Sequence, residues 1–328
     1  MKRRKWVSRA VIGIMALVLV ACGQVDDVAV DSGSEGSNDE GKIKIAMTVI
    51  NQEALFFTDM VKGAEDAAKE LGVEFTVFNA NNDSVGQYNS VEDFISSGAD
   101  AIIVNAIDAK GMEPVVEKAK NAGIKIISID SVIENDAVDV QIGVDNYQSS
   151  VQLGEYFNQY VEEKYGDQPV KVGTVGALNS EIQINREDGF KDTITQSEEV
   201  ELVNTVDGEN VQERALAASE NLLTGSPDLH FAFMTGEPAF IGMVSAVRSQ
   251  KAEEQIKLFG WDLSKQVVEG IDAGYVEAVL QQHPYEFGAE GVKAAKKLID
   301  GEEVDRQINV PVSIVTKENV DEFRSLFE

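Results

Sequence analysis

Residues 98–130, GADAIIVNAIDAKGMEPVVEKAKNAGIKIISID, hold the pattern that decides the fold. Two short runs rich in β-branched residues, 101–105 and 125–129, flank a stretch in which apolar and polar residues mix as in an amphipathic helix. A strand, a helix and a second strand in this order predict a parallel sheet covered by helices.

The same alternation continues in both directions from this unit. A helix is predicted over 57–71, because its apolar residues recur at three- and four-residue intervals, and Gly72 is placed to end it. We expect ten strands, at 43–49, 73–78, 101–105, 125–129, 138–143, 170–175, 201–206, 231–234, 256–260 and 276–280. Ten strands exceed what one compact domain of this type needs, so we expect two similar α/β lobes that change near Asp145 and Asn146.

The beginning of the chain resembles an export signal. Five basic residues precede an apolar run over 10–21 that is too short to span a bilayer comfortably, and Leu19-Val20-Ala21-Cys22 resembles a bacterial lipobox. We therefore expect 1–21 to be a lipoprotein signal peptide and Cys22 to be the lipidated first residue of the mature protein. A short buried helix is the alternative for this segment.

Residues 22–41 are rich in Gly, Ser and acidic residues and have no apolar period, which predicts a disordered linker. Their DSGSEG stretch faintly resembles a calcium loop, but acidic linkers are far commoner, and we predict no metal. Cys22 is the single cysteine, so the domain must be stable without an internal disulfide.

The charge of the chain is strongly acidic. Without the five signal basics, 23 of the 28 Lys and Arg remain against 57 Asp and Glu, a formal charge of −34. Such a charge makes nucleic acid an improbable partner and indicates a well-solvated surface.

Ligands of open α/β sheets bind beyond the carboxyl ends of the strands, so the residues that follow each apolar run are the candidates for a site. These positions are unusually polar or aromatic. They hold Asn51, Gln52, Phe56, Phe57, Asn105, Asp108, Asp130, Ser131, Arg186, Glu237, Asp262 and Gln282.

The order and spacing of several segments resemble the ribose-binding-protein branch of bacterial periplasmic sugar-binding proteins, which share their fold with lactose-repressor-type regulators. The resemblance covers residues 42–315. The segments that carry it are FFTDMVKGAEDAAKELG, GADAIIVNAID, AGIKIISID, NREDGF, ENLLTGSPDLHFAF, FGWD and QQHPYEFGAEGVKAAKKL.

The resemblance implies the type I periplasmic-binding-protein fold: two doubly wound, Rossmann-like lobes of parallel sheet, joined by a three-crossover hinge, with the ligand between them. We place the N-terminal lobe at 42–145 and 283–311, and the C-terminal lobe at 146–282 and 312–328. By the resemblance, the stacking pair of aromatics falls on Phe56 and Phe57, the first-lobe carboxylate on Asp130 and the cleft arginine on Arg186. Asp262 and Gln282 complete the match.

The sequence departs from the ribose binders at two positions. Ser131 stands where they have an arginine, and Gly236 stands where they have an asparagine. The segment before Phe56 is also one residue longer, which leaves Asn51, Gln52 or Glu53 for a polar role. Because two large side chains are lost, we expect a hexose, a sugar derivative or a small oligosaccharide rather than ribose, with Glu237 replacing a lost contact.

Each of these residues also has an ordinary structural role to weigh. A Phe-Phe pair next to a helix commonly packs in a core, and an aspartate at a strand end commonly caps a helix or forms a turn. Trp261 is equally suited to sheet packing and to lining a pocket. His230 and His283 lack metal-ligand spacing, and we expect both to be structural or surface residues.

The expected function is capture of a sugar and its delivery to the membrane subunits of an ABC permease by a monomeric, membrane-anchored, extracytoplasmic protein that needs no cofactor. The sequence has no Gly-x-Ser-x-Gly elbow, phosphate loop or His-Glu-x-x-His, so we expect no enzymatic activity. The alternatives are a subunit that presents ligand to a membrane sensor or chemoreceptor, and a glycosidase that uses Asp130 and Asp262. A transcriptional regulator is disfavoured by the export signal and the lack of a helix-turn-helix segment.

Overall fold

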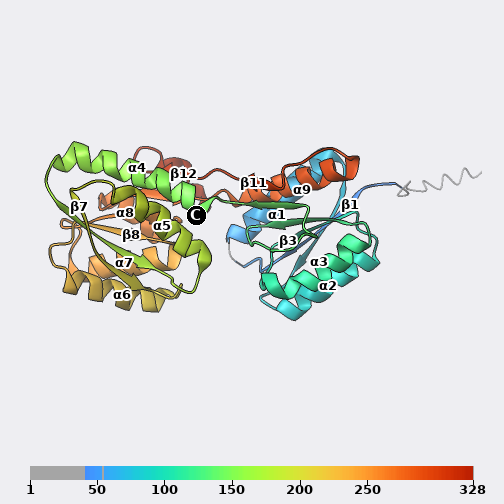
Figure 1. Ribbon diagram of the computed structural model, residues 1–328, viewed down its shortest axis with the longest axis horizontal. Coiled ribbons are helices and arrows are strands. Elements are labelled where there is room, and N and C mark those ends of the chain that lie inside the picture. Colours follow the sequence, from blue (N-terminus) through green and yellow to red (C-terminus); the bar gives the residue numbers. More distant parts are fainter. Residues whose placement is uncertain (1–40, 54, 328) are drawn as a thin grey trace, which may run out of the picture. The chain divides into compact units, whose positions relative to one another are not determined.

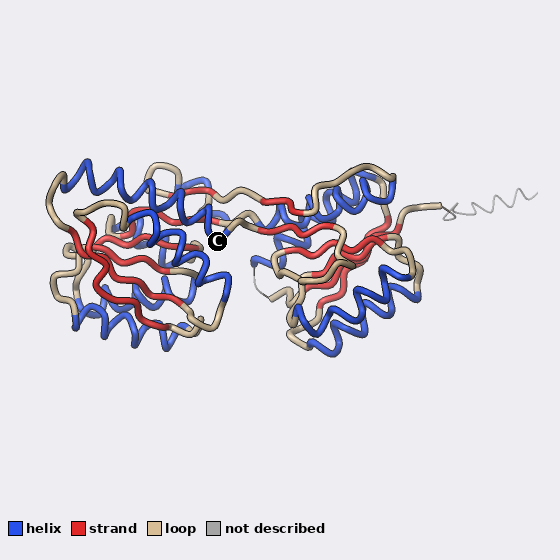
Figure 2. The backbone as a smooth tube through the Cα atoms, viewed as in Figure 1, coloured by secondary structure: helices blue, strands red, loops and turns tan. Residues whose placement is uncertain are grey.

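The chain builds two six-stranded sheets within residues 41–53 and 55–327, the part that the computed structural model describes (Figures 1 and 2). The first sheet is parallel throughout, with the strand order β11-β5-β4-β3-β1-β2. Its strands are β1 (Lys44–Val49), β2 (Glu74–Asn79), β3 (Ala101–Val104), β4 (Lys125–Ile129), β5 (Val140–Gly143) and β11 (Gln307–Asn309).

The second sheet repeats this arrangement, with the strand order β12-β10-β9-β8-β6-β7. It is parallel except for β12, which pairs antiparallel with β10. Its strands are β6 (Val170–Gly176), β7 (Val200–Asp207), β8 (Phe231–Met234), β9 (Lys257–Trp261), β10 (Val276–Gln281) and β12 (Ser313–Val315).

Helices cover both faces of the first sheet (Figure 1). Helices α1 (Leu55–Leu71) and α9 (Pro284–Asp300) lie on one face, and α2 (Ser84–Ser96) and α3 (Ala109–Asn121) lie on the other. Successive residues of β1 show why both faces need a cover: Ile45 and Met47 pack under α1 and α9, whereas Ala46 packs under α2 and α3. We call this sheet and its four helices the first lobe.

The second sheet is covered in the same way. Helices α4 (Asn146–Tyr165) and α5 (Glu181–Ile194) pack on one face through Phe157 and Phe190, which contact an aromatic cluster on β8 and β9. Helices α6 (Gln212–Gly225), α7 (Glu237–Gln250) and α8 (Lys265–Ala273) cover the other face. This sheet, its five helices and the 3₁₀ turns η1 (Val320–Glu322) and η2 (Arg324–Phe327) form the second lobe.

Helices α1 and α9 pack closely because glycines face the neighbouring backbone. A Cβ at Gly288 would collide with the carbonyl oxygen of Met60, and one at Gly63 would collide with that of Tyr285. Gly72 follows the last residue of α1 with a φ of +68°, as its predicted role in ending the helix requires. This packing fixes the first turn of α1, which carries Phe56 and Phe57.

The chain passes between the two sheets three times within the described residues: from β5 to β6, from β10 to β11, and from β11 to β12. The predicted two lobes of doubly wound sheet are confirmed. The limits predicted for each lobe stay a prediction, although β11 and β12 join the sheets to which those limits assign them.

The ten predicted strands all form, with ends that shift by one or two residues, but β11 and β12 were not predicted. Each is three residues long and too short to show a period. Cys22, the signal peptide and the linker lie outside the described residues. In the part that is described, no helix combines the length and hydropathy needed to cross a bilayer.

Candidate functional site

Asp262 follows the last residue of β9, where the chain turns away from the sheet. Its backbone is left-handed, with a φ of 67°, and its amide N–H donates to the carbonyl of Leu280 at 2.9 Å. The carboxylate accepts a hydrogen bond from Arg186 Nη1 at 3.1 Å and one from Gln282 Nε2 at 2.8 Å. Three of the predicted site residues therefore form one connected group.

Arg186 lies on α5 and is 6% exposed. Besides Asp262, its guanidinium donates to Asn146 Oδ1 at 2.8 Å and to the carbonyl of Thr235 at 3.1 Å, and it lies over the Trp261 ring at 3.9 Å. Burial lowers the pKa of Arg186, against the opposing charges of Asp262 and Asp130. These contacts hold Nε, Nη1 and one face of the guanidinium, so its orientation is fixed before any solute enters.

Asp130 is the corresponding residue of the first lobe, directly after β4. Its φ is 63°, and it accepts a hydrogen bond from Asn105 Nδ2 at 3.1 Å. Burial raises the pKa of Asp130 to about 6, while the hydrogen bond from Asn105 and the charge of Arg186 oppose the rise. Arg186 belongs to the second lobe, so the charges of the two lobes act on one another here.

Neither aspartate caps a helix. The helix after β9 is capped by Ser264, whose hydroxyl accepts from Val267 N–H, and Asp130 follows β4, which leads to β5 with no helix between them. The cap that was weighed as an ordinary role for Asp130 and Asp262 is therefore not the role they have. Both carboxylates are left to polar neighbours in the site.

A cavity of about 420 Å³ is lined by residues of both lobes. The first lobe contributes Phe56 from α1, and the second lobe contributes Glu237, Asp262 and Gln282. The Phe56 ring makes edge contacts with Phe57 at 5.3 Å and Phe287 at 6.0 Å, so its position is set by the first-lobe core. One cavity thus brings together four of the predicted site residues, one aromatic and three polar.

Glu237 is the first residue of α7 and lines this cavity. Its carboxylate has no hydrogen-bonding or ion-pair partner among the described residues, and desolvation followed by the charge of Asp262 raises its pKa. The carboxylate is therefore available to a hydroxyl group of a bound molecule.

Three predicted site residues have other surroundings. Phe57 packs against the first-lobe core, and Asn51 donates to Asn82 Oδ1 at 3.3 Å and accepts from the N–H of Glu53. The Ser131 hydroxyl accepts from the N–H of Ala106 at 2.7 Å, although the residue also lines a second cavity of about 800 Å³ that both lobes share. The structure does not bring these three into the 420 Å³ cavity, and Asp130 and Arg186 do not line it either. Four of the nine predicted site residues line it: Phe56, Glu237, Asp262 and Gln282.

Two further residues bind members of the predicted site. Asn105, a strand-end candidate to which the sequence analysis gave no role, binds Asp130. Asn146 binds Arg186 from forty positions away in the sequence, and only its place at the predicted change of lobe pointed to it.

Trp261 is fully buried in the sheet, and its indole N–H donates to Ser150 Oγ at 2.9 Å. It therefore packs in the core and does not line the cavity, while its ring lies against the guanidinium of Arg186. His230 and His283 are structural, the first accepting from Lys171 N–H and the second bonded to Ser313 Oγ. Among the described residues no group of three His, Cys, Asp or Glu is arranged to hold a metal.

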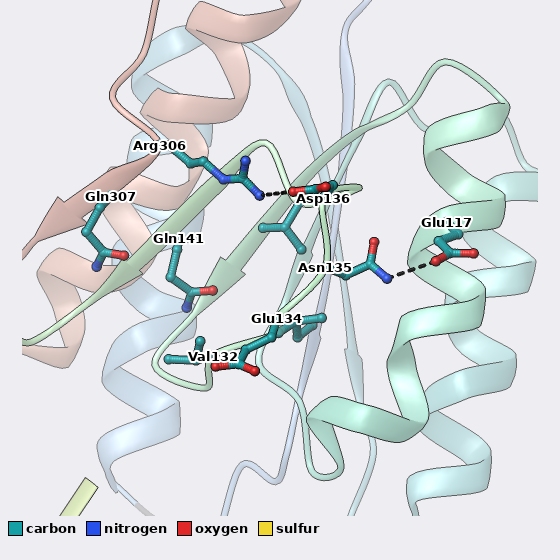
Figure 3. Close-up of a pocket in the computed structure, with 10 residues that line it drawn as sticks. Glu117, Val132, Glu134, Asn135, Asp136, Gln141, Arg306 and Gln307 are labelled. Atoms are coloured by element: carbon teal, nitrogen blue, oxygen red, sulfur yellow. Dashed lines mark hydrogen bonds and ion pairs between the residues drawn. The ribbon is translucent and has the colours of Figure 1, made fainter. Parts of the chain in front are cut away.

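A separate cavity of about 620 Å³ lies on the first lobe (Figure 3). Four of its polar residues form two pairs: Arg306 with Asp136 at 3.0 Å, and Asn135 with Glu117 at 2.9 Å. It contains no aromatic side chain, no residue of the second sheet and none of the predicted site residues. The shared cavity around Phe56 and Asp262 is the better candidate.

Comparison with known proteins agrees with this architecture. Residues 45–303 match the periplasmic binding protein domain. The ribose import binding protein RbsB of Bacillus subtilis is 26% identical over 314 residues, covering 96% of this chain and 99% of that protein.

Two solved structures share the fold. The arabinose-binding protein AraP of Geobacillus stearothermophilus superimposes with a TM-score of 0.78 at 22% identity, over 86% of this chain and 99% of that one. A periplasmic solute-binding protein of an ABC transporter from Actinobacillus succinogenes, with bound D-allose, gives 0.74 at 23% identity, over 86% of this chain and 100% of that one. The family match spans most of the chain, and the chain therefore belongs to the periplasmic binding protein family, with its type I fold.

Proposed function

We propose that this protein is an extracytoplasmic solute-binding lipoprotein that captures a sugar between its two lobes and delivers it to an ABC transporter. The observation that carries the proposal is the 420 Å³ cavity, which Phe56 of the first lobe lines together with Asp262 and Gln282 of the second. A molecule held in this cavity would contact both lobes at once.

The chemistry of the cavity suits a sugar. Sugars present flat C–H faces and a ring of hydroxyls that both donate and accept hydrogen bonds. Phe56 offers an apolar surface to such a face, while Asp262, Gln282 and Glu237 accept or donate at the edges. The relatives are named for ribose and arabinose, and one solved structure contains D-allose.

We propose a hexose, a sugar derivative or a small oligosaccharide as the ligand, in preference to ribose. The Ser131 hydroxyl accepts a hydrogen bond from the backbone N–H of Ala106, and Gly236 has no side chain. Neither residue replaces the arginine or the asparagine of the ribose binders that the sequence resembles. A site without these two large side chains would favour a larger or differently substituted ring.

Binding itself is the proposed task, without chemical conversion. The solute would bridge the first lobe, proposed as 42–145 with 283–311, and the second, proposed as 146–282 with 312–328. Contacts to both lobes stabilise a closed arrangement relative to an open one, and the permease would recognise the closed one.

We further propose that the protein acts as a monomer held to the membrane by a lipid on Cys22. The lipobox-like 19–22 and the basic, apolar start support this. Mass spectrometry of the mature N-terminus tests it: a diacylglyceryl-modified Cys22 is expected, and a protein released from the membrane with unmodified Cys22 contradicts the anchor.

The proposed function is tested by thermal unfolding of residues 42–328, a compact unit of its own, against a panel of pentoses, hexoses and disaccharides. A solute at 100 times its Kd should stabilise the unit by about 2.7 kcal/mol. Asp262→Asn should abolish the shift, whereas Asp167→Asn, the same change at an exposed loop aspartate, should preserve it. If no sugar stabilises the wild type, the proposal is wrong.

A further inference from the structure

The second lobe supplies its own aromatic ring to the shared cavity. Of the residues that line the cavity, two are aromatic: Phe56 from α1 and Phe327 from η2, the 3₁₀ turn Arg324–Phe327. Leu326 lines the cavity beside it. The other aromatic near the site, Trp261, is buried beneath Arg186 and has no face to offer a solute.

The turn that carries Phe327 is fastened to the second lobe. Arg324 donates through both terminal nitrogens to the carboxylate of Asp272, at 3.0 and 2.7 Å, and through Nε to Asp321 at 2.6 Å. A two-pronged pair of this kind fixes direction as well as position.

Two rings of the same segment anchor it further. Phe323 packs on the second-lobe core and lies 6.3 Å from the His283 ring, and Phe327 packs on the same core. Phe327 is therefore partly buried against the protein and also lines the cavity.

We propose that Phe327 is a specificity-determining residue, which covers an apolar face of the bound solute from the second lobe while Phe56 covers one from the first. This inference rests on the proposed sugar-binding function and names the ligand class more closely. A pyranose whose hydroxyls are equatorial carries C–H groups on both faces of its ring. An axial hydroxyl would instead be pressed against an aromatic ring and lose its hydrogen bonds to water.

The polar residues of the cavity fit the same ligand. Equatorial hydroxyls at the edge of a ring with two apolar faces can form hydrogen bonds with Asp262, Gln282 and Glu237. The solute class is therefore an all-equatorial or nearly all-equatorial pyranose, free or as the terminal unit of a glycoside.

The test is calorimetric titration of residues 42–328 with methyl β-D-glucoside, which has equatorial hydroxyls, and with its galactose and allose counterparts, each of which has one axial hydroxyl. Phe327→Leu keeps an apolar contact with the core but removes the flat ring. It should weaken glucoside binding about tenfold and reduce the preference for glucoside over the axial epimers. Phe78→Leu, the same change at an exposed phenylalanine of β2, should alter neither value.

The outcomes separate the two proposals. If the wild type binds sugars and Phe327→Leu binds them with the same affinity and the same epimer preference, the role of Phe327 is wrong and the sugar-binding function stands. If the wild type binds no sugar in the panel, both are wrong.

If thermal unfolding without ligand shows that the leucine variant does not fold, Phe327→Trp provides a second test of the role of Phe327. This variant should retain binding, and the emission of the new tryptophan should change on titration beyond the change given by Trp261 in the wild type. An emission change no larger than in the wild type would overturn the inference.

Discussion

Asp130 and Asp262 occupy corresponding places in the two sheets and share an unusual backbone. Each follows the third strand in the order of its sheet, each donates its N–H to the carbonyl of the neighbouring strand, and each has a left-handed φ, 63° and 67°. Non-glycine residues in this region carry strain, which persists where the surrounding structure and a function require the side chain. The shared backbone directs the Asp262 carboxylate to Arg186, Gln282 and the 420 Å³ cavity, and the Asp130 carboxylate to Asn105.

The strain at Asp262 predicts an unusual order of stability among its variants. Asp262→Gly and Asp262→Ala both remove the carboxylate that pairs with Arg186, but only alanine keeps a Cβ in the left-handed conformation. The glycine variant should therefore be more stable to urea unfolding by about 1 kcal/mol. An alanine variant as stable as the glycine variant would show that the φ of 67° is not enforced.

The pKa of Asp130 predicts a pH dependence of stability. In the folded state the pKa of Asp130 is about 6, whereas the ordinary pKa of an aspartate is 3.8. Asp130 therefore adds stability below pH 3.8, and this contribution is lost as the pH rises through about 6.

Urea unfolding of wild type and Asp130→Asn between pH 4 and pH 7 measures this contribution, because asparagine tolerates the same backbone without titrating. The wild type should lose stability relative to the variant over that range. The matched change Asp167→Asn should follow the wild-type curve. Parallel curves for wild type and Asp130→Asn would contradict the buried carboxylate.

Arg186 should not tolerate lysine. A lysine keeps the charge but cannot contact Asp262, Asn146 and the Trp261 ring together. We expect Arg186→Lys to lower the free energy of unfolding by about 2 kcal/mol and to shift the emission of Trp261. Arg306→Lys, at an exposed pair with Asp136, should cost less than about 0.5 kcal/mol and leave the emission unchanged.

Gly236 offers a test of the predicted selectivity. It is the N-cap of α7 with an extended φ of −175°, so asparagine fits the backbone, and an added Cβ would meet the Gln183 amide at 3.3 Å, a contact that a small shift relieves. Gly236→Asn should leave stability within about 0.5 kcal/mol and raise the affinity for ribose relative to hexoses. Gly236→Ala is the matched control, and an unchanged ratio in the asparagine variant would contradict the account.

Much of this architecture was predictable because each buried strand of a parallel sheet reads as a short β-branched run. The polar residues after those runs then identified Asp130 and Asp262, since the carboxyl ends of parallel strands share one edge. The pairing of Arg186 with Asp262 joins residues that are far apart in sequence, and only the resemblance to a known family brought them together before the structure did.

Other features had no local signal. A strand-end pattern cannot tell whether the Ser131 hydroxyl faces a solute or, as here, takes the Ala106 N–H. Phe327 lies in a short turn without an apolar period, and its place in the cavity wall depends on the salt bridge between Arg324 and Asp272, which tertiary folding creates.

The most direct test of the central claim is a crystal structure of residues 42–328 grown with the solute that stabilises the unit most. The account predicts that the solute lies in the 420 Å³ cavity, on Phe56 of the first lobe and within hydrogen-bonding distance of Asp262 of the second. A solute bound instead on one lobe alone, such as in the cavity beside Arg306, would contradict it.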